Sequence, residues 1–239
     1  MTAGELLARR PALVRASAAL TELAVMVALF LAYKAVRLVA DDNVDVAMSH
    51  ALSVRHVEKL LGLPSELGVQ RWMVSIPDLP NLVNVYYAYA HFPATIAFLV
   101  WMYWARPELY KRFRAVIIIS TAASLIVHLS YPLAPARMLS GFGVIDVGKG
   151  DGPDVYGTPA SSVADQYAAM PSLHVSWAVL VAVGMIVALR SRWRWLFLAH
   201  PVITVLVVVS AGHHYWLDGI VAVVLLGMAF VVAAPGRVQ

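Results

Sequence analysis

Long apolar stretches alternate with short polar segments along most of the chain. Six of these stretches are long enough, or nearly so, to cross a hydrocarbon core of about 30 Å, which takes about 20 helical residues. They cover residues 16–40, 82–104, 116–133, 173–189, 195–211 and 217–234. A helix satisfies its own backbone hydrogen bonds inside a bilayer, so runs of this length are expected to be helical. The pattern predicts an all-α chain, a polytopic membrane protein built as a six-transmembrane helix bundle.

The segment 41–81 is too polar to span a membrane. Within it, apolar residues recur at helical spacing on the side opposite Arg55, Glu58 and Lys59. These apolar positions are Leu52, Val54, Val57, Leu60, Leu61 and Leu63. We expect an amphipathic helix at about residues 45–64 that lies on the membrane surface.

No internal repeat or domain boundary is visible, so residues 1–239 are expected to form a single membrane domain. The longest irregular segment, 138–169, is rich in Gly, Pro, Ser and Asp. Long loops of this kind are usually functional or disordered.

Composition supports the membrane assignment. The chain is 61% hydrophobic and 13% charged, with a mean hydropathy of +0.73, whereas soluble domains carry about 25% charged residues. The absence of cysteine excludes disulfides, thiolate metal sites and a cysteine nucleophile. The basic residues are not gathered into one patch, which argues against a nucleic-acid partner.

Charge distribution predicts the orientation of the spans. With six spans, four short basic segments fall on one side and hold 11 of the 18 Lys and Arg residues. The positive-inside bias places that side, with both termini, in the cytoplasm. The surface helix, the 138–169 loop and the segment 213–218 then lie on the extracytoplasmic side. Cleavage of the first span as a signal peptide is an alternative, although no convincing cleavage site follows it.

Ionisable residues interrupt the apolar C-terminal region at His213, His214 and Asp218. Such side chains at membrane depth cost a few kcal/mol each and usually mark function. His214 and Asp218 are four residues apart, so a helix would place them on one face, within hydrogen-bond reach. A carboxylate that holds one imidazole nitrogen frees the other to act as a base or nucleophile.

Two further extracytoplasmic segments carry suitable partners for this pair. Pro171, Ser172 and His174 open the fourth span, and a helix start with exposed N–H groups is a ready anion site. Arg137 follows a proline-rich run at the end of the third span and is suited to bidentate phosphate binding. An arginine, a helix N-terminus and two histidines together match the needs of phosphoryl transfer.

These residues resemble the type 2 phosphatidic acid phosphatase superfamily over roughly residues 80–235. The run Pro171-Ser172-Leu173-His174 and the spacing from His214 to Asp218 look like its second and third signatures, and Arg137 lies where the first signature has its arginine. The proline-rich run before Arg137 and the Gly212-His213-His214-Tyr215 form are closer to the branch of inositol phosphorylceramide synthase and its bacterial relatives, the inositol phosphotransferase-like proteins. The set Asn84, Tyr87 and His91 in the second span points to the same branch.

The resemblance implies a covalent phosphohistidine mechanism without metal or cofactor. His214 would attack phosphorus, Asp218 would orient its ring, and His174 would protonate the leaving oxygen and then activate the acceptor. Arg137 and Ser172 would hold the phosphate oxygens. The expected partners are a phospholipid or polyprenyl phosphate in the outer leaflet and, for a transferase, a polyol such as inositol.

Two cationic positions of the usual signatures are missing. Ser130 stands where the family has a lysine, and Val208 stands where it has an arginine. Lys149, Arg71 or His213 are candidates to replace them, and the sequence does not choose among the three.

For several of these residues a purely structural role is an alternative to a functional one. His213 suits a phosphate contact or a packing role, and Arg137 could anchor a span at the interface. Asn84 and His91 share a helix face, where a substrate contact competes with interhelical hydrogen bonding. His128 and His200 are expected to be structural.

Two non-enzymatic classes compete with the phosphatase and phosphotransferase interpretation. A haem or quinone protein could use the membrane histidines as ligands, but it has no use for Arg137, Ser172 and Asp218 beside them. A transporter would show broken helices at the bilayer midplane, whereas these polar groups gather at one membrane face.

Overall fold

The computed structural model describes residues 44–149 and 167–234, together with the single positions 24, 27, 28 and 31. The predicted first span at 16–40 therefore lies almost wholly outside the described residues, as do 150–166 of the long loop and the side chain of Lys149.

Every regular element within these ranges is helical, which confirms the all-α prediction. The α-helices are α2 (Val44–Leu60), α3 (Glu66–Val74), α4 (Leu79–Val85), α5 (His91–Ala105), α6 (Pro107–Ser130), α7 (Leu173–Ala188), α8 (Ala199–Ser210) and α9 (Trp216–Val232). The shorter elements are a π-helical turn, η2 (Tyr86–Ala90), and the 3-10 turns η3 (Ala136–Met138), η4 (Val147–Lys149) and η5 (Arg192–Leu198).

Helices α5 to α9 form an elongated bundle in which α7 packs against α5, α6, α8 and α9. Its core is aromatic and aliphatic, with Phe98, Phe113, Leu180 and Leu226 buried. A Cβ on Gly184 would lie 2.2 Å from Phe98 Cζ, so this glycine lets α5 and α7 approach closely.

Within the part of the chain that the structure describes, two helices, Pro107–Ser130 and Arg192–Ser210, are long and apolar enough to cross a bilayer, and Leu173–Ala188 and Trp216–Val232 are shorter apolar helices. Their boundaries follow the predicted spans closely. The predicted span at 116–133 is the exception, because α6 already begins at Pro107. That the chain crosses the membrane six times stays a prediction.

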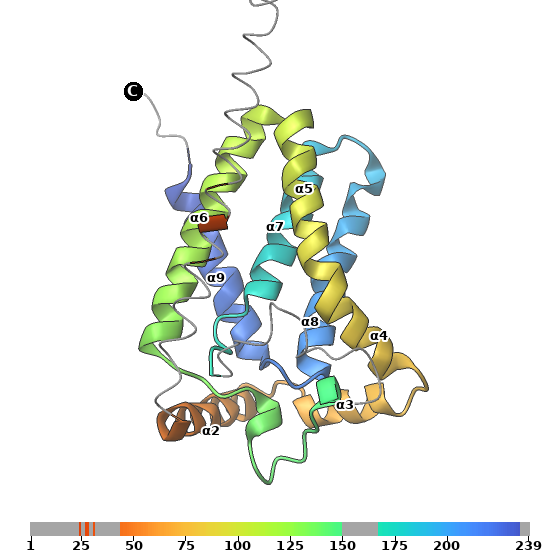
Figure 1. Cartoon of the computed structure of the whole chain (residues 1–239), viewed down its shortest axis with the longest axis vertical. Helices are drawn as coiled ribbons and strands as arrows, with labels where there is room; N and C mark the ends of the chain where they lie inside the picture. Colours follow the sequence, from red (N-terminus) through yellow and green to blue (C-terminus); the bar gives the residue numbers. More distant parts are fainter. Residues whose placement is uncertain (1–23, 25–26, 29–30, 32–43, 150–166, 235–239) are drawn as a thin grey trace, which may run out of the picture.

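Helices α2 and α3 lie across one end of the bundle (Figure 1). At this end α6 and α8 finish and α7 and α9 begin, so the segments predicted to carry chemistry meet there. The opposite end carries the α5–α6 junction and η5, with Arg106, Arg192 and Arg194.

Helix α2 agrees with the predicted amphipathic helix in position but not in the placement of Glu58. The sequence pattern puts Glu58 on the polar face, yet it is only 3% exposed, whereas Leu52 and Leu60 are 58% and 73% exposed. A tertiary contact explains the burial of Glu58, because its carboxyl group accepts the backbone N–H of Leu217 at the start of α9. Helix α3 was not predicted, since nine residues of mixed polarity give no clear periodicity.

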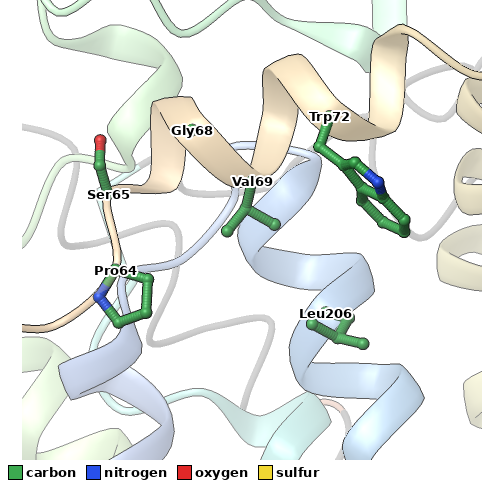
Figure 2. A pocket seen from close by; sticks show the side chains of 6 residues that line it. All are labelled: Pro64, Ser65, Gly68, Val69, Trp72 and Leu206. Carbon is green, nitrogen blue, oxygen red and sulfur yellow. The ribbon is translucent and has the colours of Figure 1, made fainter.

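A shallow apolar groove of about 380 Å³ lies between α3 and α8 (Figure 2). It is lined by Pro64, Ser65, Gly68, Val69, Trp72 and Leu206. Trp72 is 60% exposed there, so this side of the molecule offers an apolar surface next to α8.

Candidate active site

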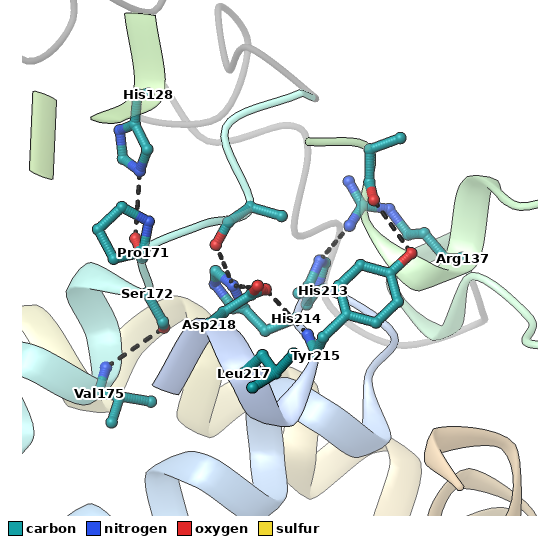
Figure 3. Close-up of polar contacts among 12 residues, drawn as sticks. His128, Arg137, Pro171, Ser172, Val175, His213, His214, Tyr215, Leu217 and Asp218 are labelled. Carbon is teal, nitrogen blue, oxygen red and sulfur yellow. Dashed lines mark hydrogen bonds and ion pairs between the residues drawn. The ribbon is translucent and has the colours of Figure 1, made fainter. Parts of the chain in front are cut away.

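Main-chain hydrogen bonds join the three segments that carry the predicted motifs. The amide of Arg137 donates to the carbonyl of Gly212 (3.0 Å), and the amide of Ser172 donates to the carbonyl of Asp218 (3.1 Å). The amide of Ala169 donates to Leu133 (3.2 Å). The end of α6, the start of α7 and the α8–α9 connection therefore form one unit (Figure 3).

His214 is oriented through its Nδ1 atom. This nitrogen lies 2.8 Å from the carbonyl oxygen of Ala169 and 3.1 Å from Asp218 Oδ2. A carbonyl and a carboxylate only accept, so Nδ1 carries the hydrogen and donates it. When the ring is neutral, Nε2 is therefore the nitrogen without a hydrogen, which is the form a nucleophile needs.

Asp218 holds this arrangement by capping α9. It is fully buried, and its Oδ2 also accepts the backbone N–H of Tyr215, the N-cap residue, at 2.9 Å. His214 precedes the helix, so its contact with Asp218 comes from the capping geometry and not from two residues on one helix face. Tyr215 in turn donates its hydroxyl to the carbonyl of Ala134 (3.1 Å).

Arg137 and His213 are hydrogen-bonded on one side of the site, where Arg137 supplies the positive charge. Arg137 Nη1 donates to His213 Nδ1 at 2.7 Å, since a guanidinium cannot accept. Arg137 Nε also lies 3.6 Å from Asp146 Oδ2. Burial, and then the charge of Arg137, lower the pKa of His213 well below its usual value, so His213 is neutral at physiological pH.

Gly212 allows Arg137 to approach. It has φ +73°, and a Cβ there would lie 2.7 Å from Val144 Cγ1 and 3.2 Å from Arg137 Cβ. Both the backbone conformation and the lack of space require glycine.

His174 lies among aromatic rings beside His214. The two histidine ring centroids are 6.1 Å apart. Tyr87 stacks on both His174 (4.6 Å) and His213 (4.2 Å), and the His91 ring is 4.8 Å from His174. The π-helical turn at Tyr86–Ala90 therefore brings Tyr87 into the site, and such turns are frequent at functional positions.

Ser172 is the N-cap of α7, and its hydroxyl accepts the N–H of Val175 (3.4 Å). Behind it, His128 Nε2 donates to the carbonyl of Pro171 (3.1 Å). His128 thus supports the loop before Ser172 from α6, in keeping with its predicted structural role.

The remaining predicted residues lie farther from these groups. Asn84 is buried and its amide donates to the carbonyl of Val147 at 2.8 Å, so it holds the 140s loop. Ser130 is exposed and bonded to Ile126, and Arg71 is exposed on α3. Val208 is buried, and its carbonyl accepts the amides of His213 and His214. Which group replaces the missing cations stays a prediction.

Sequence reasoning missed three contributors, namely Ala169, Asp146 and Glu58. The carbonyl of Ala169 has no side-chain signal at all, while Asp146 and Glu58 gave no motif. Within the described ranges, no group of three or more His, Cys, Asp or Glu side chains is placed to hold a metal ion.

A family model described as the PAP2 superfamily matches residues 52–232. No curated protein and no solved structure matches the chain significantly. The matched range contains every residue of the histidine, aspartate and arginine cluster described above, and members of the superfamily act on phosphate esters as phosphatases or phosphotransferases. The chain belongs to the PAP2 superfamily.

Proposed function

We propose that this protein transfers phosphoryl groups from lipid-linked phosphate through a covalent phosphohistidine on His214. The observation that carries the proposal is that His214 Nδ1 is hydrogen-bonded to both the carbonyl of Ala169 and the carboxylate of Asp218. Nε2 is therefore the nitrogen that can act as the nucleophile.

The first step forms a bond from His214 Nε2 to phosphorus and breaks the bond from phosphorus to the lipid oxygen. Protonated His174 gives its proton to that leaving oxygen, and Asp218 offsets the positive charge gained by the His214 ring. Arg137 and Ser172, with His213, hold the other phosphate oxygens.

The second step frees the enzyme. An acceptor hydroxyl loses its proton to His174 as its oxygen attacks phosphorus, and the bond to His214 breaks. With water the product is inorganic phosphate, and the protein is a phosphatase. The step leaves His174 protonated for the next cycle, and none of the steps calls for a metal or cofactor.

Two observations support a polyol acceptor such as inositol. His91 is buried beside His174, and neither of its ring nitrogens has a hydrogen-bond partner among the described residues. Unused hydrogen-bonding groups next to the residue that activates the acceptor suit an alcohol with several hydroxyls.

We place this chemistry at the extracytoplasmic face of a six-span membrane bundle with both termini in the cytoplasm. The candidate site lies at the α2–α3 end, and the basic residues Arg106, Arg192 and Arg194 lie at the other end. The substrate would then be a phospholipid or polyprenyl phosphate of the outer leaflet.

Phosphate release from phosphatidic acid and polyprenyl diphosphate tests the proposal with the purified protein in detergent. We expect His214→Ala to lower kcat by about 10³-fold or more, while His56→Ala, an exposed histidine on α2, keeps wild-type turnover. Chelation with EDTA should not reduce the rate. Transfer to added inositol, measured as phosphoinositol, separates a transferase from a phosphatase.

Acid-quenched protein should carry phosphate on His214 and not in His214→Ala. Full turnover by His214→Ala, or no turnover by the wild type on either substrate, would contradict the proposal.

A further inference from the structure

Two buried carboxyl groups lie beneath the start of α9. Glu58 at the end of α2 and Glu66 at the start of α3 are each 3% exposed, and each has one buried carboxyl oxygen, Glu58 Oε2 and Glu66 Oε1, with no hydrogen-bond partner among the described residues. Two buried carboxylates that repel each other and lack partners for these oxygens are costly, which favours a proton on one of them. The pair therefore holds at least one proton.

This pair is attached to the helix that carries Asp218. Glu58 Oε1 accepts the backbone N–H of Leu217 at 2.9 Å, and the indole N–H of Trp216 donates to the carbonyl of Pro64 at 2.7 Å. The α2–α3 hairpin thus fixes the first turn of α9 at the two residues before Asp218.

Helix dipoles indicate which acid carries the proton. Glu66 is the first residue of α3, where a negative charge is favoured, whereas Glu58 lies in the last turn of α2, where it is disfavoured. Burial and the neighbouring Glu66 raise the pKa of Glu58 to about 9, against the opposing effect of the Leu217 N–H. Both arguments place the proton on Glu58.

The proton matters because Asp218 is close by. Loss of the proton would put two carboxylates of the hairpin next to the buried carboxylate that orients His214. Repulsion among three such charges would favour protonation of Asp218 and weaken its hold on Nδ1 of His214. Tyr215 also interacts electrostatically with both acids, and Arg55 in turn interacts with Tyr215.

We infer that Glu58 is a positioning residue for phosphoryl transfer, a neutral carboxylic acid beside Glu66 that fixes the first turn of α9 and leaves Asp218 ionised. This role rests on the proposed function, because it acts through Asp218 on His214.

Substituting Glu58 with an uncharged isostere tests the role. Glu58→Gln keeps an acceptor for Leu217 and a donor for Glu66, so kcat at pH 7 should stay within about threefold of wild type. Glu58→Ala should lower kcat by more than about tenfold with little change in KM. Asp45→Asn, an exposed acid on the same helix, is the matched control for an acid-to-amide substitution in α2 and should keep wild-type kcat.

The pH profile separates this role from simple packing. Wild-type kcat should fall as pH rises through about 9, when Glu58 loses its proton, and Glu58→Gln should not show this loss. The inference would be overturned if Glu58→Gln were as impaired as Glu58→Ala. It would also be overturned if kcat of Glu58→Gln fell at alkaline pH in the same way as kcat of the wild type.

Infrared spectroscopy gives a readout that does not need turnover. The carbonyl stretch of a buried protonated carboxyl should be present at pH 7 in the wild type, in Asp45→Asn and in His214→Ala, and absent in Glu58→Gln. A band that persists in Glu58→Gln would exclude Glu58 as the protonated acid. A wild type without turnover would instead overturn the proposed function and the positioning role with it, whatever the band shows.

Discussion

The two ring nitrogens of His214 differ because of what surrounds Nδ1. Two acceptors, the carbonyl of Ala169 and the carboxylate of Asp218, share the hydrogen on that atom. Removing the charge of Asp218 while keeping its shape therefore isolates its contribution to the reactivity of Nε2.

We expect Asp218→Asn to lower kcat by about 10²- to 10⁴-fold with a nearly unchanged KM, because an amide favours the wrong tautomer and cannot offset charge on the ring. Steady-state phosphate release measures both constants. The buried side chain keeps its size, so the thermal unfolding temperature in detergent should change little. A rate close to wild type would show that Ala169 alone suffices to orient His214.

Among elements, the α8–α9 connection has the strictest geometry. Its main chain turns back so that Val208 accepts two amides and Gly212 lies against Arg137. Any side chain at position 212 would crowd Val144 and Arg137.

We expect Gly212→Ala to destabilise the protein by about 1–3 kcal/mol, because alanine at a positive φ is strained and its Cβ meets Val144. Activity should fall together with the unfolding temperature. Gly227→Ala on α9 is the control, since a Cβ there meets nothing within 4 Å, and it should keep both properties.

Most helices could be predicted because each reads as a long apolar run. Helix α7, predicted at 173–189, spans Leu173–Ala188, and proline and serine before it mark its start. The burial of Glu58 could not be predicted, because the periodicity of α2 gives its faces but not the α9 amide that Glu58 meets.

The candidate site was partly accessible from the sequence. Motif spacing suggested that Arg137, His174 and His214 belong together, and the structure brings them to one end of the bundle. The stacking of Tyr87 on both His174 and His213 could not be predicted. It depends on a π-helical turn, and no residue type in the sequence indicates such a turn.

At the scale of the whole molecule, the site end and the basic end lie on opposite sides of the bundle (Figure 1). If the bundle crosses a membrane, these ends face different compartments. The chain contains no cysteine, so single cysteines can report the side of each end without background.

We expect Lys59→Cys on α2 to react with a membrane-impermeant maleimide in intact cells, because it is exposed at the site end. Arg192→Cys, exposed in η5 at the other end, should react only after permeabilisation. Gel-shift labelling measures both, and the reverse pattern would place the site on the cytoplasmic side.

The π-helical turn has an evolutionary consequence. A π turn holds one more residue than the α turn it replaces, so the Tyr86–Ala90 segment carries a local one-residue surplus. Relatives that lack this surplus cannot direct both position 87 and position 91 toward His174 from the same helix. A one-residue gap in an alignment at this point would then separate lineages that have the stacked tyrosine from lineages in which this ring cannot reach both histidines.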